Sequence, residues 1–310
     1  MTKPTEDKLE KIPIINVLVR ICKKIKIPGL YGMSLYEVLE MYVIGIVEGA
    51  LTTRAGGIAF SFFMAIFPFL LFLLTLIYHI PVDGFQEALM TLIQETLPPK
   101  TFGAVEPILD DIIKNQNKGL LSFGFIASIF LMTNGVNAIF GGFEYSYHIK
   151  EVRNVIRAYF ISLGTSLMMT LFLVITIGLI ILYGIGLKRL KANELLDNDF
   201  FWLQLGTGVL FVFMIFTIVS TLYHYGTKEG KESSFFSAGA IFTTLLCIFT
   251  FYLFGIYVVE FSKYNELYGS IGTLLILMLF IWLNSIILLL GFELNATLNT
   301  LKKKNKAIDE

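Results

Sequence analysis

Six stretches of the sequence contain no Asp, Glu, Lys or Arg, and each is 25 to 30 residues long. They cover residues 55–82, 119–143, 158–187, 200–227, 233–259 and 267–292. A helix needs about 20 apolar residues to cross the hydrocarbon core of a bilayer, so each stretch can span it with some tilt. Since only 15% of the 310 residues are charged, a soluble chain would have too little polar surface to cover six such helices. The sequence therefore predicts an all-α, polytopic membrane protein with six transmembrane helices.

Neither a transmembrane β-barrel nor a secretory signal peptide fits these stretches. A barrel is built from short segments in which apolar and polar residues alternate, whereas each stretch here is continuously apolar. The first 30 residues are polar and basic, and the first apolar stretch is longer than the apolar core of a secretory signal peptide. We therefore expect no signal peptide and assign all six stretches to spanning helices.

The distribution of Lys and Arg predicts the orientation of the chain. Seventeen of the 24 basic residues lie before the first stretch, in the second and fourth connections, or after the last stretch. Cytoplasmic segments carry the excess of basic residues in membrane proteins, so both termini are expected in the cytoplasm. The formal net charge is zero, so no overall field attracts nucleic acid. The two cysteines, Cys22 and Cys247, are expected to be free thiols.

The chain is predicted to have three parts: a cytoplasmic and interfacial N-terminal segment, a membrane domain with an outer cap loop, and a basic cytoplasmic tail. They cover residues 1–53, 54–299 with the loop at 83–118, and 300–310. Within the first part, residues 34–53 show a helical pattern in which Ser34 and Glu37 form a capping box. We expect this amphipathic helix to lie along the membrane interface; a soluble cytoplasmic helix is the alternative.

The second stretch carries polar and small residues on one predicted helical face. Asn134, Asn137, Gly141, Glu144 and His148 stand at offsets of 0, 3, 7, 10 and 14 residues. Such residues hold membrane helices together, but polar side chains retained in a bilayer also mark solute pathways. Both interpretations stay open. Pro68, in the middle of the first stretch, allows the same two interpretations. A proline kink can serve helix packing, or it can shape a cavity.

Charged residues at the ends of the stretches predict two buried ion pairs. Glu144 is followed by Arg153 and Arg157 at the start of the third stretch, and pairing would offset part of its desolvation cost. Glu293 lies near the inner end of the sixth stretch, at the depth of Arg54, which makes these two residues the second candidate pair. The candidates to line a cavity are Pro68, Asn134, Asn137, Glu144, Asn284 and Asn295, of which the last two share a helical face.

The sequence contains no phosphate-binding loop, dinucleotide fingerprint, nucleophile elbow or zinc motif. The three histidines, His79, His148 and His224, sit at the ends of different stretches, without Cys or carboxylates at ligand spacing. We therefore expect no enzyme activity, no cofactor and no metal site.

Three segments resemble the YihY/BrkB family of membrane proteins. They are RAGGIAFSFFMAIFPFLLFLL at 54–74, NAIFGGFEYSYHIKEVR at 137–153 and YNELYGSIGTLLILMLFIWLNSIILLLGFELNA at 264–296. The resemblance implies a six-helix protein of the bacterial inner membrane with both termini inside, in agreement with the charge distribution. Members of this family are labelled ribonuclease BN-like, tied to serum resistance or considered as transporters. Residues 223–228, at the end of the fourth stretch, lack the Pro-Asn of the family pattern.

These observations support two classes of function. The leading hypothesis is a transporter or lipid-handling protein with a polar cavity among the first, second and sixth helices. The alternative is a non-catalytic envelope scaffold that binds a partner through the outer cap and the cytoplasmic helix. A membrane nuclease is not favoured, because the cytoplasmic carboxylates are scattered and form no evident two-metal cluster. The expected partners are membrane lipids and not nucleic acid, with a protein partner or a homo-oligomer left open.

Overall fold

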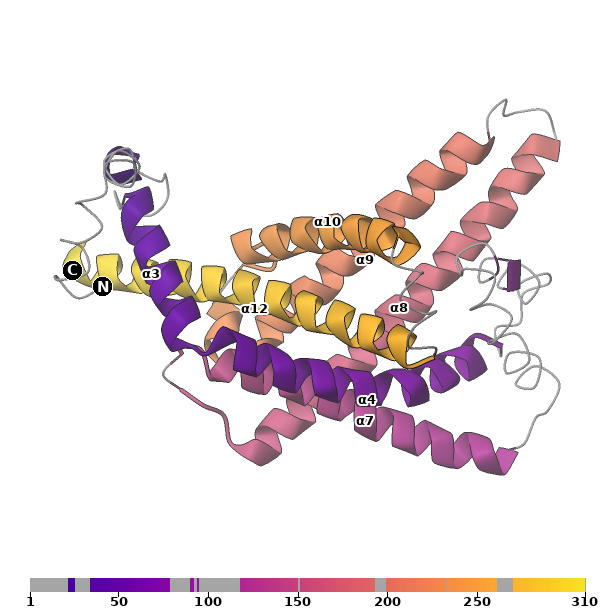
Figure 1. Cartoon of the computed structure of the whole chain (residues 1–310), viewed down its shortest axis with the longest axis horizontal. Coiled ribbons are helices and arrows are strands. Elements are labelled where there is room, and N and C mark those ends of the chain that lie inside the picture. Colours follow the sequence, from indigo (N-terminus) through magenta and orange to yellow (C-terminus); the bar gives the residue numbers. More distant parts are fainter. Residues whose placement is uncertain are drawn as a thin grey trace. The chain divides into compact units, whose positions relative to one another are not determined.

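The computed structural model describes residues 22–25, 34–78, 90–91, 94, 118–149, 151–192, 199–232, 234–260 and 270–309. The helices of this part are α3 (Leu35–Glu48), α4 (Leu51–Tyr78), α7 (Lys118–Glu144), α8 (Val155–Ala192), α9 (Asp199–Gly226), α10 (Ala238–Glu260) and α12 (Ser270–Asp309), with a short 3-10 helix, η1 (Glu229–Glu232) (Figure 1). The predicted all-α fold is confirmed. Nearly all of the predicted outer cap, 83–118, and most of residues 1–33 lie outside the described residues.

Each charge-free stretch coincides with most of one long helix, from α4 to α12. A continuous apolar run becomes a helix in lipid because every backbone polar group must be bonded within the segment. Five helices of the described part, α7 to α10 and α12, are long and apolar enough to cross a membrane. α3 and α4 meet at an angle of 61° and make a sixth span if this bent pair is counted as one.

The chain divides into two compact units. Unit 1 consists of Met1–Phe60, Ala138–Val155 and Val219–Glu310, and unit 2 of Ser61–Asn137 and Ile156–Ile218. Unit 1 therefore holds α3, η1, α10 and α12, with the beginning of α4 and the last turns of α7 and α9. Unit 2 holds the rest of α4, α7 and α9, and nearly all of α8.

In unit 1, α10 packs along α12 through two glycines (Figure 1). A Cβ atom on Gly239 of α10 would collide with the carbonyl oxygen of Gly291 on α12. A Cβ atom on Gly291 would collide with the hydroxyl of Thr243, which lies 2.5 Å from the hydroxyl of Tyr223. Small residues let membrane helices approach this closely, so the two glycines set the distance between α10 and α12.

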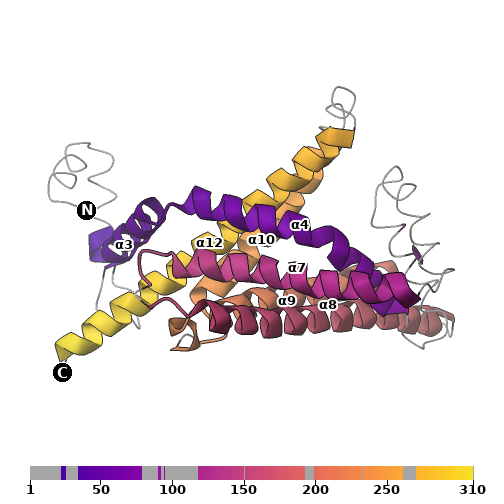
Figure 2. The ribbon, with the colours of Figure 1, turned by 90° about the horizontal axis from the view of Figure 1, so that it is seen from below.

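The N-terminal helix α3 packs on α12 in the same unit (Figure 2). It begins with the predicted capping box, which is confirmed: the backbone N–H of Glu37 donates to Ser34 Oγ, and the backbone N–H of Ser34 donates to Oε2 of Glu37. It ends at Glu48 with Gly49 as its C-cap, and Ala50 then takes a left-handed conformation with φ of 47° before α4 begins. This two-residue turn produces the bend between α3 and α4.

Candidate functional site

Arg54, in the first turn of α4, and Glu293, on α12, form a buried ion pair in unit 1. Nη2 of Arg54 lies 2.6 Å from Oε1 of Glu293, and the two side chains are 6% and 0% exposed. Nη1 of Arg54 also donates a hydrogen bond of 2.9 Å to the carbonyl oxygen of Gly142, in the last turn of α7. The structure thus brings together the two residues that the sequence analysis pairs, and adds a backbone acceptor.

Two residues of the turn after α7 join this ion pair to α12 and α3. Ser146 Oγ donates a hydrogen bond of 2.8 Å to Oε2 of Glu293. Nε2 of His148 lies 3.2 Å from the hydroxyl of Thr297 on α12 and 3.2 Å from the carbonyl oxygen of Met41 on α3. These contacts make the turn a bridge between three elements of unit 1.

The structure corrects the predicted position of His148, which was expected on the same helical face as Asn134 and Asn137. α7 ends at Glu144, and the N–H of Ser146 bonds to the carbonyl oxygen of Phe143, so the chain turns there and leaves the helix. After this turn, Nε2 of His148 lies 3.2 Å from the hydroxyl of Thr297 on α12. Helical spacing predicts a shared face only as far as the helix continues.

The second predicted pair, Glu144 with Arg153, is also present in unit 1. Nε of Arg153 lies 2.6 Å from Oε1 of Glu144, and both side chains are buried. Nη1 donates to the carbonyl oxygen of Tyr225 at 2.8 Å, and Nη2 donates to that of Gly226. Arg157, the other candidate partner, lies on the first turn of α8 with an exposed side chain.

Asn295 fixes the start of α10 on α12. Its Oδ1 accepts a hydrogen bond of 2.8 Å from the backbone N–H of Gly239, and its Nδ2 donates one of 2.8 Å to Ser237 Oγ. The void that Asn295 borders is about 10 Å³, room for about one water molecule. Asn284 is half-buried and donates to the carbonyl oxygen of Phe280 in its own helix. Both asparagines therefore have their amides engaged in structural hydrogen bonds.

The remaining predicted cavity residues lie in unit 2. Asn137 Oδ1 accepts a hydrogen bond of 3.2 Å from Ser162 Oγ on α8, which ties α7 to α8. Asn134 is half-buried on α7. α4 continues as a helix through Pro68, whose side chain lies outside the described set. For Asn137, the observed contact is of the helix-packing kind.

Unit 2 contains an apolar cavity of about 220 Å³ between α4, α7, α8 and α9. Its lining residues come from all four helices and are Phe62, Ala65, Ile66, Met132, Gly135, Val136, Ser166, Met169, Thr170, Leu173 and Ile218. The two hydroxyl groups in this lining are already used: Ser166 Oγ donates to the carbonyl oxygen of Leu163, and Thr170 Oγ1 donates to that of Ser166. The cavity therefore offers a guest apolar contacts and little hydrogen bonding.

Sequence reasoning missed this cavity because its lining residues look like ordinary membrane-helix residues. The signal that could have pointed to it is the combination of Ala65 and Gly135. A Cβ atom on Gly135 would lie 3.6 Å from Phe62 and 3.7 Å from Ala65, which are ordinary contact distances. The missing side-chain volume at these two positions leaves space between α4 and α7.

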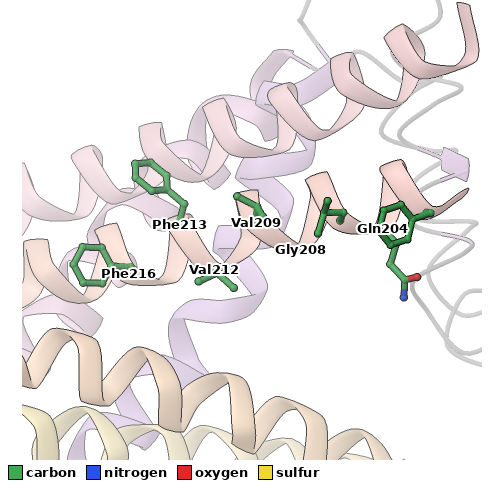
Figure 3. Close-up of a pocket in the computed structure, with 8 residues that line it drawn as sticks. Gln204, Gly208, Val209, Val212, Phe213 and Phe216 are labelled. Carbon is green, nitrogen blue, oxygen red and sulfur yellow. The ribbon is translucent and has the colours of Figure 1, made fainter. Parts of the chain in front are cut away.

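A second, open groove of about 680 Å³ runs along one side of α9 in unit 2. Its lining residues recur every three or four positions and are Phe201, Gln204, Leu205, Gly208, Val209, Val212, Phe213 and Phe216 (Figure 3). Gln204 is the one polar side chain among them. Because α9 is long and apolar enough to cross a membrane, this is the kind of surface that lipid chains cover.

The described residues include no group of three or more His, Cys, Asp or Glu side chains that could hold a metal ion. Glu144 and Glu293, the carboxylates in the buried set of the described residues, are each bound by an arginine. The buried charges of unit 1 are thus arranged as ties between its elements, and the apolar cavity of about 220 Å³ lies among the helices of unit 2.

Comparison with known proteins gives a consistent result. The family described as virulence factor BrkB matches residues 45–309. The Bacillus subtilis (strain 168) ribonuclease-like protein YfkH is 32% identical over 257 residues, 81% of this chain and 91% of that protein. UPF0761 membrane proteins of Coxiella burnetii (strain Dugway 5J108-111) and Haemophilus influenzae (strain 86-028NP) are 25% and 24% identical, over 77% and 81% of this chain and 84% and 91% of theirs. No solved structure matches the chain.

Proposed function

The chain belongs to the BrkB family of membrane proteins, and on this premise we propose that it handles a lipid, or another molecule with a hydrocarbon chain, in the bacterial inner membrane. The family resemblance drawn from the sequence is confirmed, and so is the integral membrane class. Of the two activities in the leading hypothesis from the sequence, transport and lipid handling, we propose lipid handling.

The observation that carries the proposal is the apolar cavity of unit 2. An apolar cavity of about 150 Å³ stays free of water because its walls offer no hydrogen bonds, and it can bind a guest of the size of benzene. The cavity here is larger, about 220 Å³, and the hydroxyls of Ser166 and Thr170 are bonded to backbone carbonyls. Each methylene group that leaves water for such a site contributes about 0.8 kcal/mol, so a lipid chain or a chain of similar size is the guest that the cavity suits.

The ribonuclease-like name of the Bacillus subtilis relative is not extended to this chain. Glu144 and Glu293, the buried carboxylates among the described residues, are neutralised by Arg153 and Arg54. A carboxylate held in this way supports the fold and is not free to bind a catalytic metal ion.

The test is photo-crosslinking of the purified protein in lipid nanodiscs with a phospholipid that carries a diazirine on its acyl chain. We expect crosslinks in peptides that contain residues 62–66, 132–136 and 166–173. Gly135→Leu fills the cavity, because its Cβ fits without collision and the rest of the side chain occupies the space. The yield of crosslinks in this variant is expected to fall at least about tenfold, which corresponds to a loss of about 1.4 kcal/mol in binding free energy.

Gly164→Leu is the matched control, because Gly164 lies on α8 and a Cβ there meets nothing within 4 Å. It is expected to retain wild-type crosslinking. Wild-type protein whose crosslinks fall evenly over all apolar helices, or a Gly135→Leu variant that is folded and crosslinks normally, would reject the proposal. Size-exclusion chromatography and the apparent melting temperature establish whether each variant is folded.

A further inference from the structure

We propose that α3 is an interfacial helix that binds the lipid surface through one apolar strip, made of Leu39, Val43 and Val47, while its opposite side is docked on α12. This inference concerns unit 1 alone and does not depend on the proposed lipid cavity. It identifies which residues of the N-terminal helix meet the bilayer and which kind of attraction holds them there.

The docked side of α3 is defined by close contacts in unit 1. Val38 and Leu301 of α12 form a buried apolar cluster. The hydroxyl of Tyr42 donates a hydrogen bond of 3.1 Å to the carbonyl oxygen of Leu290 on α12. Gly45 approaches so closely that a Cβ atom there would lie 2.7 Å from Nε2 of His148 and 3.0 Å from Oε2 of Glu293. These contacts fix the rotation of α3 about its own axis.

Within the part of the chain that the structure describes, the fixed rotation leaves a second apolar strip exposed. Leu39, Val43 and Val47 follow one another at intervals of four residues and are 43%, 41% and 69% exposed. At 100° per residue this strip lies roughly opposite the docked side. A helix that is apolar on two sides needs a cover for both, and α12 covers only one.

The acidic residues of α3 form a third strip. By the same helical spacing, Glu37, Glu40 and Glu48 lie together between the docked side and the open apolar strip. No basic residue is present on α3. The helix therefore has one side for α12, one for an apolar medium and one for water, which is the arrangement of a helix lying at a membrane surface.

The occupant of the open strip is the bilayer because α3 is continuous with a membrane helix. Only Gly49 and Ala50 separate it from α4, which contains most of the first charge-free stretch of the sequence. The 61° bend turns α3 away from the axis of α4, so that α3 would run closer to the membrane plane than to its normal when α4 crosses the bilayer. Lipid that surrounds α4 thus extends directly under the strip of Leu39, Val43 and Val47.

The attraction is hydrophobic and not electrostatic. Leu39, Val43 and Val47 carry no charge, and the neighbouring strip of α3 is acidic, so α3 itself offers anionic headgroups no attraction. We therefore expect α3 to hold its position on zwitterionic phosphatidylcholine as firmly as on bilayers that contain phosphatidylglycerol.

The experiment measures the surroundings of single residues of α3 by spin labelling. Cys22 and Cys247 are replaced by Ser and Ala, a single cysteine is placed at Val43 or Glu48, and the full chain is reconstituted in phosphatidylcholine vesicles. Collisions of the nitroxide with oxygen, which concentrates in lipid, are compared with collisions with a water-soluble nickel chelate. We expect the ratio of oxygen to nickel collisions to be at least fivefold higher at Val43 than at Glu48, with and without phosphatidylglycerol.

Two results would overturn the inference. A label at Val43 with as much nickel contact as one at Glu48 would place the strip in water. A label at Val43 that reaches neither reagent would mean that protein, such as a second copy of the chain, covers the strip. If Val43→Cys does not fold, Val47→Cys on the same strip gives the same comparison.

Discussion

Arg54 and Arg153 each bind a buried glutamate together with carbonyl oxygens in the last turn of a membrane helix. Arg54 reaches Gly142 in α7, and Arg153 reaches Tyr225 and Gly226 in α9. The last four carbonyl groups of a helix have no partner within it, and leaving them unbonded in an apolar medium costs several kcal/mol each. The arginines satisfy these carbonyls, and the glutamates neutralise the arginines.

This arrangement makes Arg153 the residue whose loss the fold tolerates least at the end of α9. Arg153→Met leaves Glu144 buried and unpaired, together with two carbonyl oxygens. Removing one partner of a buried pair costs about 3–5 kcal/mol, so this variant is expected to lower the apparent melting temperature in detergent by about 10 °C. Differential scanning fluorimetry of the purified protein measures the change.

Arg157→Met provides the comparison, because Arg157 is a neighbouring arginine with an exposed side chain. Exposed substitutions usually change stability by less than about 0.5 kcal/mol, so its melting temperature is expected to stay within about 2 °C of wild type. An equal loss in both variants would show that the positive charge of this segment matters and the Glu144 pair does not.

At the scale of helices, the contact between α10 and α12 depends on the absence of two side chains. Gly239 and Gly291 bring the backbones so close that Asn295 can bond the first turn of α10. The hydroxyls of Tyr223 and Thr243 fill the space beside Gly291, and Tyr223 also donates to the carbonyl oxygen of Leu288. A methyl group at either glycine would separate the helices and break these hydrogen bonds together.

Gly239→Ala is therefore expected to destabilise the protein by about 1–3 kcal/mol, the usual effect of an added methyl group in a packed core. Gly255→Ala, on the same helix, is the matched control, since a Cβ there meets nothing within 4 Å. It should be neutral or stabilising by up to about 1 kcal/mol. Thermal unfolding of both variants in one detergent distinguishes them, and a neutral Gly239→Ala would contradict the packing argument.

The helices could be predicted from the sequence because charge is absent over six long runs, and lipid leaves such runs no other structure. Their ends could not, because polar residues such as those beyond Leu301 continue the helix in water as readily as they end it. Arg54 and Glu293 could be paired because charges are rare at that depth. Their contacts with Gly142 and Ser146 depend on how α7 packs and on the turn that follows it, neither of which a residue pattern predicts. The cavity depends on how four apolar helices fit together.

For the whole molecule, the excess of Lys and Arg on one side supports our proposal that both termini face the cytoplasm. Green fluorescent protein fused after Glu310 is then expected to fluoresce, because it folds in the cytoplasm. Alkaline phosphatase inserted in the connection 193–198, between α8 and α9, is expected to be active, because it needs the oxidising side.

If the C-terminal fluorescent fusion is bright but the phosphatase inserted at 193–198 is inactive, that connection is in the cytoplasm and α8 does not cross the membrane. If green fluorescent protein at the C-terminus does not fluoresce and alkaline phosphatase at the same position is active, the C-terminus lies on the outer side and the predicted orientation is wrong. Immunoblots of the fusions in isolated membranes show that each is produced in comparable amount.

α12 is one unbroken helix of 40 residues, about 60 Å long and so about twice the thickness of the hydrocarbon core. A stiff rod of this length acts as a lever: a 5° change of tilt about its centre moves either tip by roughly 3 Å. Leu301, far along this rod, is fastened to Val38 of α3. Leu301 lies about 17 Å beyond the middle of Ser270–Asp309, so the same change of tilt would displace its contact with α3 by roughly 1.5 Å, about half the length of a hydrogen bond.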